Sequence, residues 1–255
     1  KILKILEKKE IEDKERRIKA IKAFIFETKG EFQESLKIYE ELTKEIKDKD
    51  LLKSCLINFG TLKGKSGCLE EAKEIFEKIF KIKNMKLNIF DEITLKNNLF
   101  VIELEMGNYK IYQEILNFFE KYHLIYPYNL IPITINLITL EILLGKINEA
   151  EKHIEWFFEK AMDTQNNFYK AIAYKFLGDI ESLKGNYEKS EKILEKALKI
   201  GEGSKEAENK IYISFVENFI KKKDIKNLEK WVNIFEKEFP KEDLKINFYK
   251  GKLNI

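Results

Sequence analysis

Residues 171–200, AIAYKFLGDIESLKGNYEKSEKILEKALKI, decide the fold of this 255-residue chain. Apolar residues recur three and four positions apart on both sides of Gly185, which is typical of two amphipathic helices joined at a glycine corner. Small residues at Gly178, Ser190 and Ala197 would let the two helices approach closely. The stretch therefore predicts a helical hairpin.

The same corner recurs along the whole chain, with a large apolar residue two positions after it in every case. Its six instances begin at Gly30, Gly67, Gly107, Gly145, Gly185 and Lys223, so that successive corners are 37 to 40 residues apart. Repetition of one two-helix unit at a nearly constant period predicts a solenoid, in which each unit buries its apolar face against the next.

The 171–200 hairpin also carries the spacing of a known family. The matching residues are Tyr174, Leu177, Gly178, Gly185, Tyr187, Ser190, Leu194, Ala197 and Leu198. In these positions the chain resembles a tetratricopeptide repeat, although Glu181 stands where an aromatic residue is usual and Glu202 where a proline is. The resemblance implies an all-α, right-handed superhelical solenoid of about six helix-turn-helix repeats. The long period is similar to that of bacterial regulators that sense peptide signals.

We predict one solenoid over residues 1–255. Its expected parts are a partial N-terminal helix (1–15), six repeats (16–52, 53–92, 93–130, 131–170, 171–208 and 209–242) and a capping helix (243–255) in which Phe248 and Tyr249 pack inward. Repeats three and six place large residues where the other repeats have small ones. These residues are Phe100, Tyr112, Val216 and Leu228, and we expect looser or rotated packing there.

Charge and hydropathy argue against two classes of function, direct binding of nucleic acid and insertion into a membrane. Lys plus Arg (47) nearly balance Asp plus Glu (44), so the chain has no overall basic excess for direct binding of nucleic acid. The uncharged run from Tyr122 to Leu140 is interrupted by Pro127 and Pro132 and follows the repeat pattern. We therefore expect an inter-repeat loop followed by a buried helix, and no membrane span.

The sequence shows no catalytic or metal-binding constellation. Residues 60–66, GTLKGKS, have too few residues between their glycines for the phosphate loop G-x-x-x-x-G-K-[ST], and they end a helix instead of following a strand. His123 and His153 have no second ligand at metal-binding spacing. Cys55 and Cys68 would lie roughly 20 Å apart along one helix, too far for a disulfide. Two unpaired thiols suit the cytoplasm, and we expect no enzymatic activity, metal or cofactor.

One helix face points to a ligand. When each first helix is numbered so that its corner residue is position 15, core residues fall at positions 4, 7, 8 and 11, and positions 2, 6, 9 and 13 face another side. In stacked hairpins of the family this second side lines the concave groove. Position 6 is occupied in turn by Ile21, Asn58, Asn98, Asn136, Phe176 and Ser214.

Asparagine offers a hydrogen-bond donor and an acceptor together, so it can hold a peptide backbone without recognising its side chains. First helices about 8–10 Å apart would place one asparagine at about every third residue of an extended peptide. The resemblance implies the same role, because peptide-binding tetratricopeptide proteins use groove asparagines as a backbone-gripping ladder. The predicted peptide-binding residues are Asn58, Thr61, Asn97, Asn98, Val101, Ile135, Asn136, Thr139, Lys175 and Phe176. Among them Lys175 would receive a carboxylate. Val101, Ile135 and Phe176 would set specificity.

We therefore interpret the chain as a non-enzymatic module that binds an extended peptide or protein segment in its groove. Two alternatives stay open. One is a sensor domain in signalling, belonging to a transcriptional regulator whose DNA-binding part lies outside this sequence; the absence of an initiator methionine and the long repeats favour it. The other is an assembly scaffold that joins partners through its convex face or self-associates. The ligand, its direction and the oligomeric state are not determined by the sequence.

Overall fold

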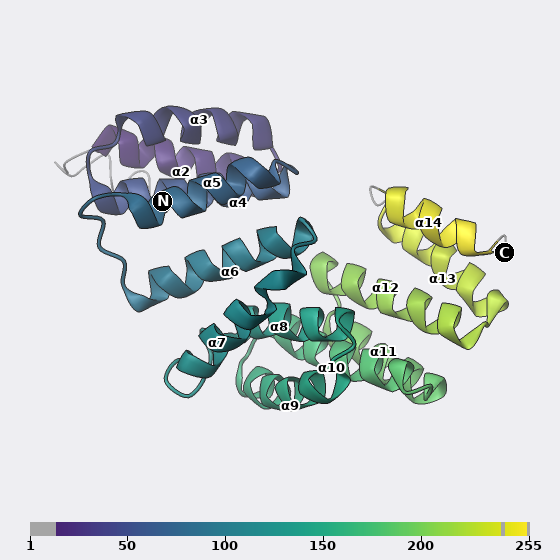
Figure 1. Ribbon diagram of the computed structural model, residues 1–255. Coiled ribbons are helices and arrows are strands. Elements are labelled where there is room, and N and C mark those ends of the chain that lie inside the picture. The colour runs from purple at the N-terminus through teal and green to yellow at the C-terminus, as the bar shows by residue number, and fades with distance from the viewer. Residues whose placement is uncertain (1–13, 241–242, 254–255) are drawn as a thin grey trace. The chain divides into compact units, whose positions relative to one another are not determined.

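The computed structural model describes residues 14–240 and 243–253. These residues form thirteen α-helices, one 3₁₀ helix and no strand (Figure 1). The helices are α2 (Lys14–Thr28), α3 (Phe32–Glu45), α4 (Lys49–Lys65), α5 (Leu69–Lys81), α6 (Ile89–Glu105), the 3₁₀ helix η1 (Tyr109–Ile111), α7 (Tyr112–Tyr122), α8 (Ile131–Leu143), α9 (Ile147–Asp163), α10 (Asn167–Leu183), α11 (Tyr187–Ile200), α12 (Lys205–Lys222), α13 (Ile225–Glu238) and α14 (Asp243–Leu253). The predicted all-α fold is confirmed. Most of the expected N-terminal helix (residues 1–13), the end of the sixth repeat (241–242) and the end of the capping helix (254–255) lie outside the described residues.

The helices form six successive hairpins followed by α14. Their first helices begin at Lys14, Lys49, Ile89, Ile131, Asn167 and Lys205, at or up to four residues before the expected start of each repeat. Polar N-caps explain the earlier starts: the Asp48 side chain accepts a hydrogen bond from the Leu51 N–H, and the Asn88 side chain accepts one from the Asp91 N–H. Both capping residues precede the first apolar residue from which the repeat boundaries were predicted, so the helices begin earlier than that pattern indicates.

Every hairpin turns at a residue in the left-handed region. The five corner glycines have φ between +70° and +81°, and Lys223, at the sixth corner, has φ +59°. At the corner of residues 171–200, the Asn186 N–H donates to the Glu181 carbonyl at 2.9 Å and the Gly185 N–H to the Ser182 carbonyl at 3.1 Å. This is the Schellman arrangement, which satisfies the last carbonyls of the first helix. Glycine adopts it without a Cβ penalty, which explains the period seen in the sequence.

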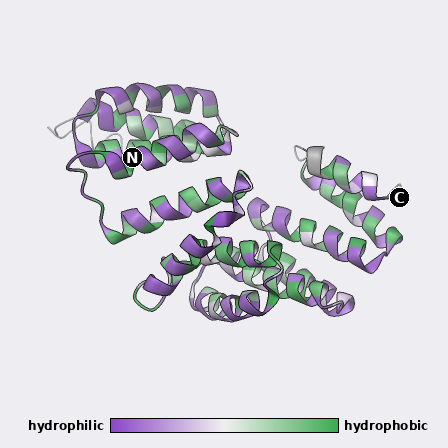
Figure 2. Ribbon diagram, viewed as in Figure 1, coloured by the Kyte–Doolittle hydropathy of each residue, from purple (hydrophilic) through white to green (hydrophobic). Residues whose placement is uncertain are grey.

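The chain forms two compact units, Lys1–Phe118 and Phe119–Ile255. In unit 1, Tyr39 and Leu62 are buried in a core built by α2, α3 and α4, and Phe76 lies in a second core built by α4, α5 and α6. In unit 2 one core extends over α8 to α14 and includes Phe157 and Phe235. Hydrophobic and hydrophilic residues alternate along each helix, as amphipathic packing requires (Figure 2).

The third hairpin departs from the other five. Its second helix begins with the 3₁₀ turn η1; Ile111 and Ile115 are buried, whereas Tyr112, at the position of a small residue in other repeats, is only half-buried. The position of Tyr112 is occupied by a buried alanine or serine in four other hairpins, and a phenol ring does not fit there. The helix is therefore rotated by one residue, or about 100°. This confirms the rotated packing predicted for repeat three.

The sixth hairpin keeps the regular register. We expected looser or rotated packing in repeat six, but Val216 and Leu228, the large residues that replace small ones, are both buried at their repeat positions, so no rotation is observed. In the C-terminal helix α14, Tyr249 is buried as expected. Phe248 is 60% exposed, so the prediction that it packs inward was wrong.

The uncharged run from Tyr122 to Leu140 forms the last residue of α7, a connecting segment and most of α8. Leu137 and Leu140 on α8 are fully buried, which confirms the predicted loop and buried helix. In the parts of the chain covered by the structure, no helix has the length and apolar character needed to cross a membrane.

Candidate peptide-binding site

A cleft of about 180 Å³ in unit 1 opens between the first helices α4 and α6. Its lining residues are Thr61, Gly64, Lys65, Phe76, Asn98, Val101, Ile102 and Glu105. Thr61, Asn98 and Val101 belong to the predicted peptide-binding set. The structure therefore brings together three predicted residues from two adjacent repeats.

Two glycines of α4 shape the floor of this cleft. A Cβ atom on Gly64 would lie 2.8 Å from the Ile102 Cδ1 atom, and a Cβ atom on Gly60 would lie 2.7 Å from the Phe76 ring. Both contacts are shorter than van der Waals separation, so glycine allows α4 to pack closely against α5 and α6. The glycines of residues 60–66, a segment that resembles a phosphate loop, thus have a packing role. The segment lies at the end of α4, as predicted from the sequence.

A hydrogen-bonded amide forms one wall of the cleft. The Asn98 Nδ2 atom donates to the Thr61 hydroxyl at 3.3 Å, and that hydroxyl donates to the Ile57 carbonyl at 2.8 Å. This pair of bonds holds the amide in place between α6 and α4. The Asn98 carbonyl oxygen and its second N–H have no partner among the described residues, so one acceptor and one donor are available to a ligand.

The floor of the cleft is apolar and its rim carries both charges. Phe76 and Ile102 are 1% and 4% exposed. At the rim, Lys65 forms an ion pair with Glu27 at 2.8 Å, whereas Glu105 is exposed and makes no ion pair within residues 14–240 and 243–253. Because the Lys65 side chain is 54% exposed, this ion pair contributes only about 0–1 kcal/mol.

The remaining predicted residues of unit 1 lie outside this cleft lining. The Asn58 Nδ2 atom donates to the Tyr39 hydroxyl at 3.3 Å, so the amide is anchored to a fully buried phenol. Burial raises the pKa of Tyr39 to about 12, which keeps the phenol neutral. Asn97 is half-buried on α6, beside Asn98.

The other predicted residues belong to unit 2. Ile135 and Asn136 are half-buried on α8, and the exposed Thr139 donates its hydroxyl to the Ile135 carbonyl at 2.7 Å. Lys175 on α10 forms an ion pair with Asp179 at 2.6 Å, which already supplies the carboxylate that it was expected to receive from a ligand.

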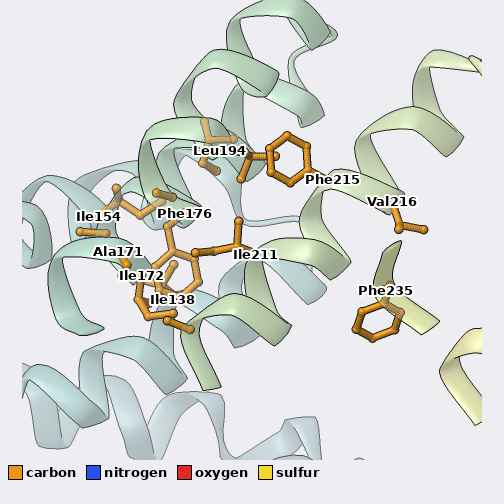
Figure 3. Packing of buried hydrophobic residues seen from close by; sticks show 14 of the residues in the cluster. Ile138, Ile154, Ala171, Ile172, Phe176, Leu194, Ile211, Phe215, Val216 and Phe235 are labelled. Carbon is orange, nitrogen blue, oxygen red and sulfur yellow. The ribbon is translucent and has the colours of Figure 1, made fainter. Parts of the chain in front are cut away.

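Phe176 has a different position from the one predicted. It is 2% exposed and lies in the core of unit 2, where its ring meets that of Phe157 edge to face with centroids 6.0 Å apart. Figure 3 shows it among buried side chains of α8, α10 and α12. Its expected place on the groove surface is therefore corrected. An aromatic ring at position 6 gains more from the adjacent core than from a solvated face.

Sequence reasoning missed five lining residues of the cleft: Gly64, Lys65, Phe76, Ile102 and Glu105. A signal for two of them was present, because Lys65 and Glu105 both occupy position 13 of the predicted groove face. Phe76 comes from a second helix, and no numbering of the first helices could have found it.

Other reactive groups are used structurally. Glu141 is fully buried, and both of its carboxylate oxygens lie 2.9 Å from the His153 Nδ1 atom. Both cysteines are free thiols, and burial raises the pKa of Cys55 to about 11, which makes it a poor nucleophile. Among the residues with described positions, no three His, Cys, Asp or Glu side chains are arranged to hold a metal ion.

Comparisons with known proteins agree with the repeat architecture. Residues 171–200 match the family described as tetratricopeptide repeat. A crystal structure of a tetratricopeptide repeat protein from Parabacteroides merdae is similar in fold, with 14% identity, a TM-score of 0.56 and coverage of 94% of this chain and 99% of that chain. A structure of BtubC (BKLC) from P. vanneervenii has 17% identity and a TM-score of 0.37, over 89% of this chain and 80% of that one. No curated protein matches the chain by sequence.

Residues 171–200 thus form a tetratricopeptide repeat, and the chain as a whole has an all-α repeat fold similar to that of a tetratricopeptide repeat protein. Repeats of this class generally mediate protein–protein interactions and are typically non-enzymatic.

Proposed function

We propose that this protein binds an extended peptide or protein segment along the groove face of its first helices, without covalent chemistry. The observation that carries the proposal is the cleft between α4 and α6, where Thr61, Asn98 and Val101 converge over an apolar floor. One side chain of the segment would enter the cleft, and its backbone would bind the free carbonyl oxygen and N–H of Asn98.

The energetics assign different roles to these contacts. A neutral hydrogen bond to Asn98 contributes only about 0.5–1.5 kcal/mol, so the amide by itself cannot hold a ligand. The apolar surface of the half-buried Val101 would supply the rest, and therefore the choice of side chain. Within unit 2 the same helix positions are occupied by Asn136 and Thr139, which we propose as the equivalent contacts of that unit with a peptide.

The test begins with selection of ligands from a random dodecamer peptide library, followed by calorimetric titration of the selected peptides. Asn98→Ala is expected to weaken most of them by similar factors, about 2- to 13-fold for one lost hydrogen bond. Val101→Asp is expected to weaken them by unequal factors, because it changes the cleft that receives the side chain. Asn233→Ala, on the exposed face of α13, is the matched control and should bind like the parent.

Two results would count against the proposal. If the selected peptides bind Asn98→Ala and Val101→Asp as tightly as the parent, the groove face of unit 1 is not the site. If Asn98→Ala removes binding of some peptides and leaves others unchanged, the amide recognises side chains and the backbone-gripping role is wrong.

A further inference from the structure

Two clefts, one in each unit, have the same chemistry at equivalent repeat positions. Their volumes are about 290 Å³ in unit 1 and 230 Å³ in unit 2, and each lies between the second helix of one hairpin and the first helix of the next. Both contain a Glu, Phe, Leu and Glu at the same four positions. These are Glu77, Phe80, Leu99 and Glu103 in unit 1 and, each 78 residues later, Glu155, Phe158, Leu177 and Glu181 in unit 2.

In unit 1 the chain supplies a cation to its own cleft. The Lys96 ammonium lies 5.8 Å from the centre of the Phe80 ring and forms an ion pair with Glu114 at 2.6 Å. Lys81 also lines the cleft and pairs with Glu77 at 3.5 Å. A lysine fits such a place because its methylene stem covers apolar surface while its ammonium binds an aromatic face and a carboxylate.

In unit 2 both of these lysines are replaced. Tyr174 stands at the position equivalent to Lys96, and Glu159 at the position equivalent to Lys81. Tyr174 packs edge-on against Phe158, with centroids 5.1 Å apart, and the Lys196 ammonium lies 4.3 Å from the centre of the Tyr174 ring. The unit 2 cleft therefore retains the Glu, Phe, Leu and Glu of its counterpart and lacks both lysines, whereas Phe100, Ile111 and Glu114 of unit 1 are replaced by Gly178, Lys189 and Lys192.

One carboxylate of the unit 2 cleft is left without a cation. Glu151 forms an ion pair with Lys184, and Glu181 forms one with Lys189 at 3.0 Å. Glu155 is exposed and, within the described parts of the chain, makes no ion pair. The cleft thus combines the half-buried side chains of Phe158 and Leu177 with one carboxylate, Glu155, that forms no ion pair among the described residues.

We propose that the unit 2 cleft between α9 and α10 accepts a lysine side chain from a partner protein. The methylene stem would pack on Phe158 and Leu177, and the ammonium would bind Glu155. A volume of about 230 Å³ is several times that of a water molecule, about 30 Å³, and accommodates a butylammonium group. The cleft uses positions 7, 10 and 11 of α10, which differ from the groove positions 2, 6, 9 and 13, so the proposal is independent of the peptide groove.

The test uses Nα-acetyl-lysine N-methylamide as the probe and its norleucine counterpart, which has the same stem without the charge. Each is titrated into protein labelled at isoleucine and leucine methyl groups, and NMR shifts of Ile154, Leu177 and Ile180 are followed. The lysine probe is expected to give saturable shifts at millimolar concentration. It should bind about two- to fivefold more tightly than the norleucine probe.

Three variants sharpen the result. Glu155→Gln should remove the preference for lysine over norleucine, whereas Glu70→Gln, an exposed carboxylate on α5, should leave it unchanged. Tyr174→Lys places a lysine at the position equivalent to Lys96; because Lys192 replaces its partner Glu114 in unit 2, the new ammonium is expected to bind Glu155 and block the probe. The proposal is overturned if the three methyl groups show no saturable shift, if norleucine binds as well as lysine, or if Glu155→Gln and Glu70→Gln behave alike.

Discussion

Gly178 sets the approach of α10 to α11, and adding a single methyl group there tests the packing argument. A Cβ atom on Gly178 would lie 2.7 Å from Leu194 Cδ2, 2.8 Å from Leu194 Cγ and 3.6 Å from the Ser190 carbonyl oxygen. Leu194 is fully buried, and its Cγ atom is not the free end of a flexible chain, so the helices or the side chain must shift.

Two effects of opposite sign determine the magnitude for Gly178→Ala. Overpacking of a filled core costs about 1–3 kcal/mol. Replacing glycine by alanine inside a helix stabilises the folded protein by about 1 kcal/mol, because alanine has the higher helix propensity. We therefore expect a net loss of about 1 kcal/mol in the free energy of unfolding.

A double-mutant cycle with Leu194→Ala isolates the clash. Leu194→Ala alone is expected to cost about 2–5 kcal/mol, because it leaves a cavity. In that background the clash is absent, so Gly178→Ala should stabilise the protein by about 1 kcal/mol and the sign of its effect reverses. Urea unfolding followed by circular dichroism measures all four proteins, and equal m-values show that the same transition is compared.

Gly251→Ala is the control for helix propensity. Gly251 lies in α14, and no atom comes within 4 Å of a Cβ atom built on it, so this variant should not lose stability. The packing argument is refuted if Gly178→Ala has the same effect with Leu194 and with Ala at position 194, or if it stabilises the parent.

Two further predictions concern the corners and an ion pair. Lys223→Gly is expected to raise the free energy of unfolding by about 0.5–1 kcal/mol, because Lys223 has φ +59°, whereas Gly185→Ala should lower it by about 1 kcal/mol; equal signs for the two variants in urea unfolding would contradict this. Lys53 donates to Asp91 at 2.7 Å, and this hydrogen bond raises the pKa of Lys53 above 10.5. Because the folded-state pKa is the higher one, the pair stabilises fully below about pH 10.5 and the stabilisation is lost as the pH rises through the folded-state pKa. The urea midpoint of Lys53→Met should therefore fall less steeply than that of the parent as the pH rises from about 10 to 12. Parallel pH profiles for the two proteins would refute a stabilising role of the Lys53–Asp91 pair.

The repeat corners show how much of the fold was predictable. A Schellman corner involves six consecutive residues, one of which has a left-handed backbone conformation that favours glycine. The preference therefore depends on local sequence alone, and the corner glycines recur at a period that can be recognised in the sequence. The same reasoning placed the sixth corner at Lys223, where the left-handed conformation is observed without glycine.

The candidate site was predictable only in part, and for a physical reason. Thr61, Asn98 and Val101 occupy regular positions on first helices, and helical periodicity places them on one face. Phe176 has the same periodic position as Asn98 and nevertheless packs into the core. Periodicity defines a direction on a helix, whereas burial depends on the neighbouring helix and on the size of the side chain.

For this protein the sequence by itself determined the helices, the corners and the repeat period, because these depend on contacts within a few residues of the chain. The tertiary structure decided the features that join distant residues. It rotated the third hairpin, where Tyr112 does not fit between helices, and it opened the cleft above Phe76. It also formed a cleft beside Glu155 whose lining includes no lysine, whereas the lining of the equivalent cleft in unit 1 includes two. Such features depend on which side chains fill the space between helices, and the chain alone does not specify them.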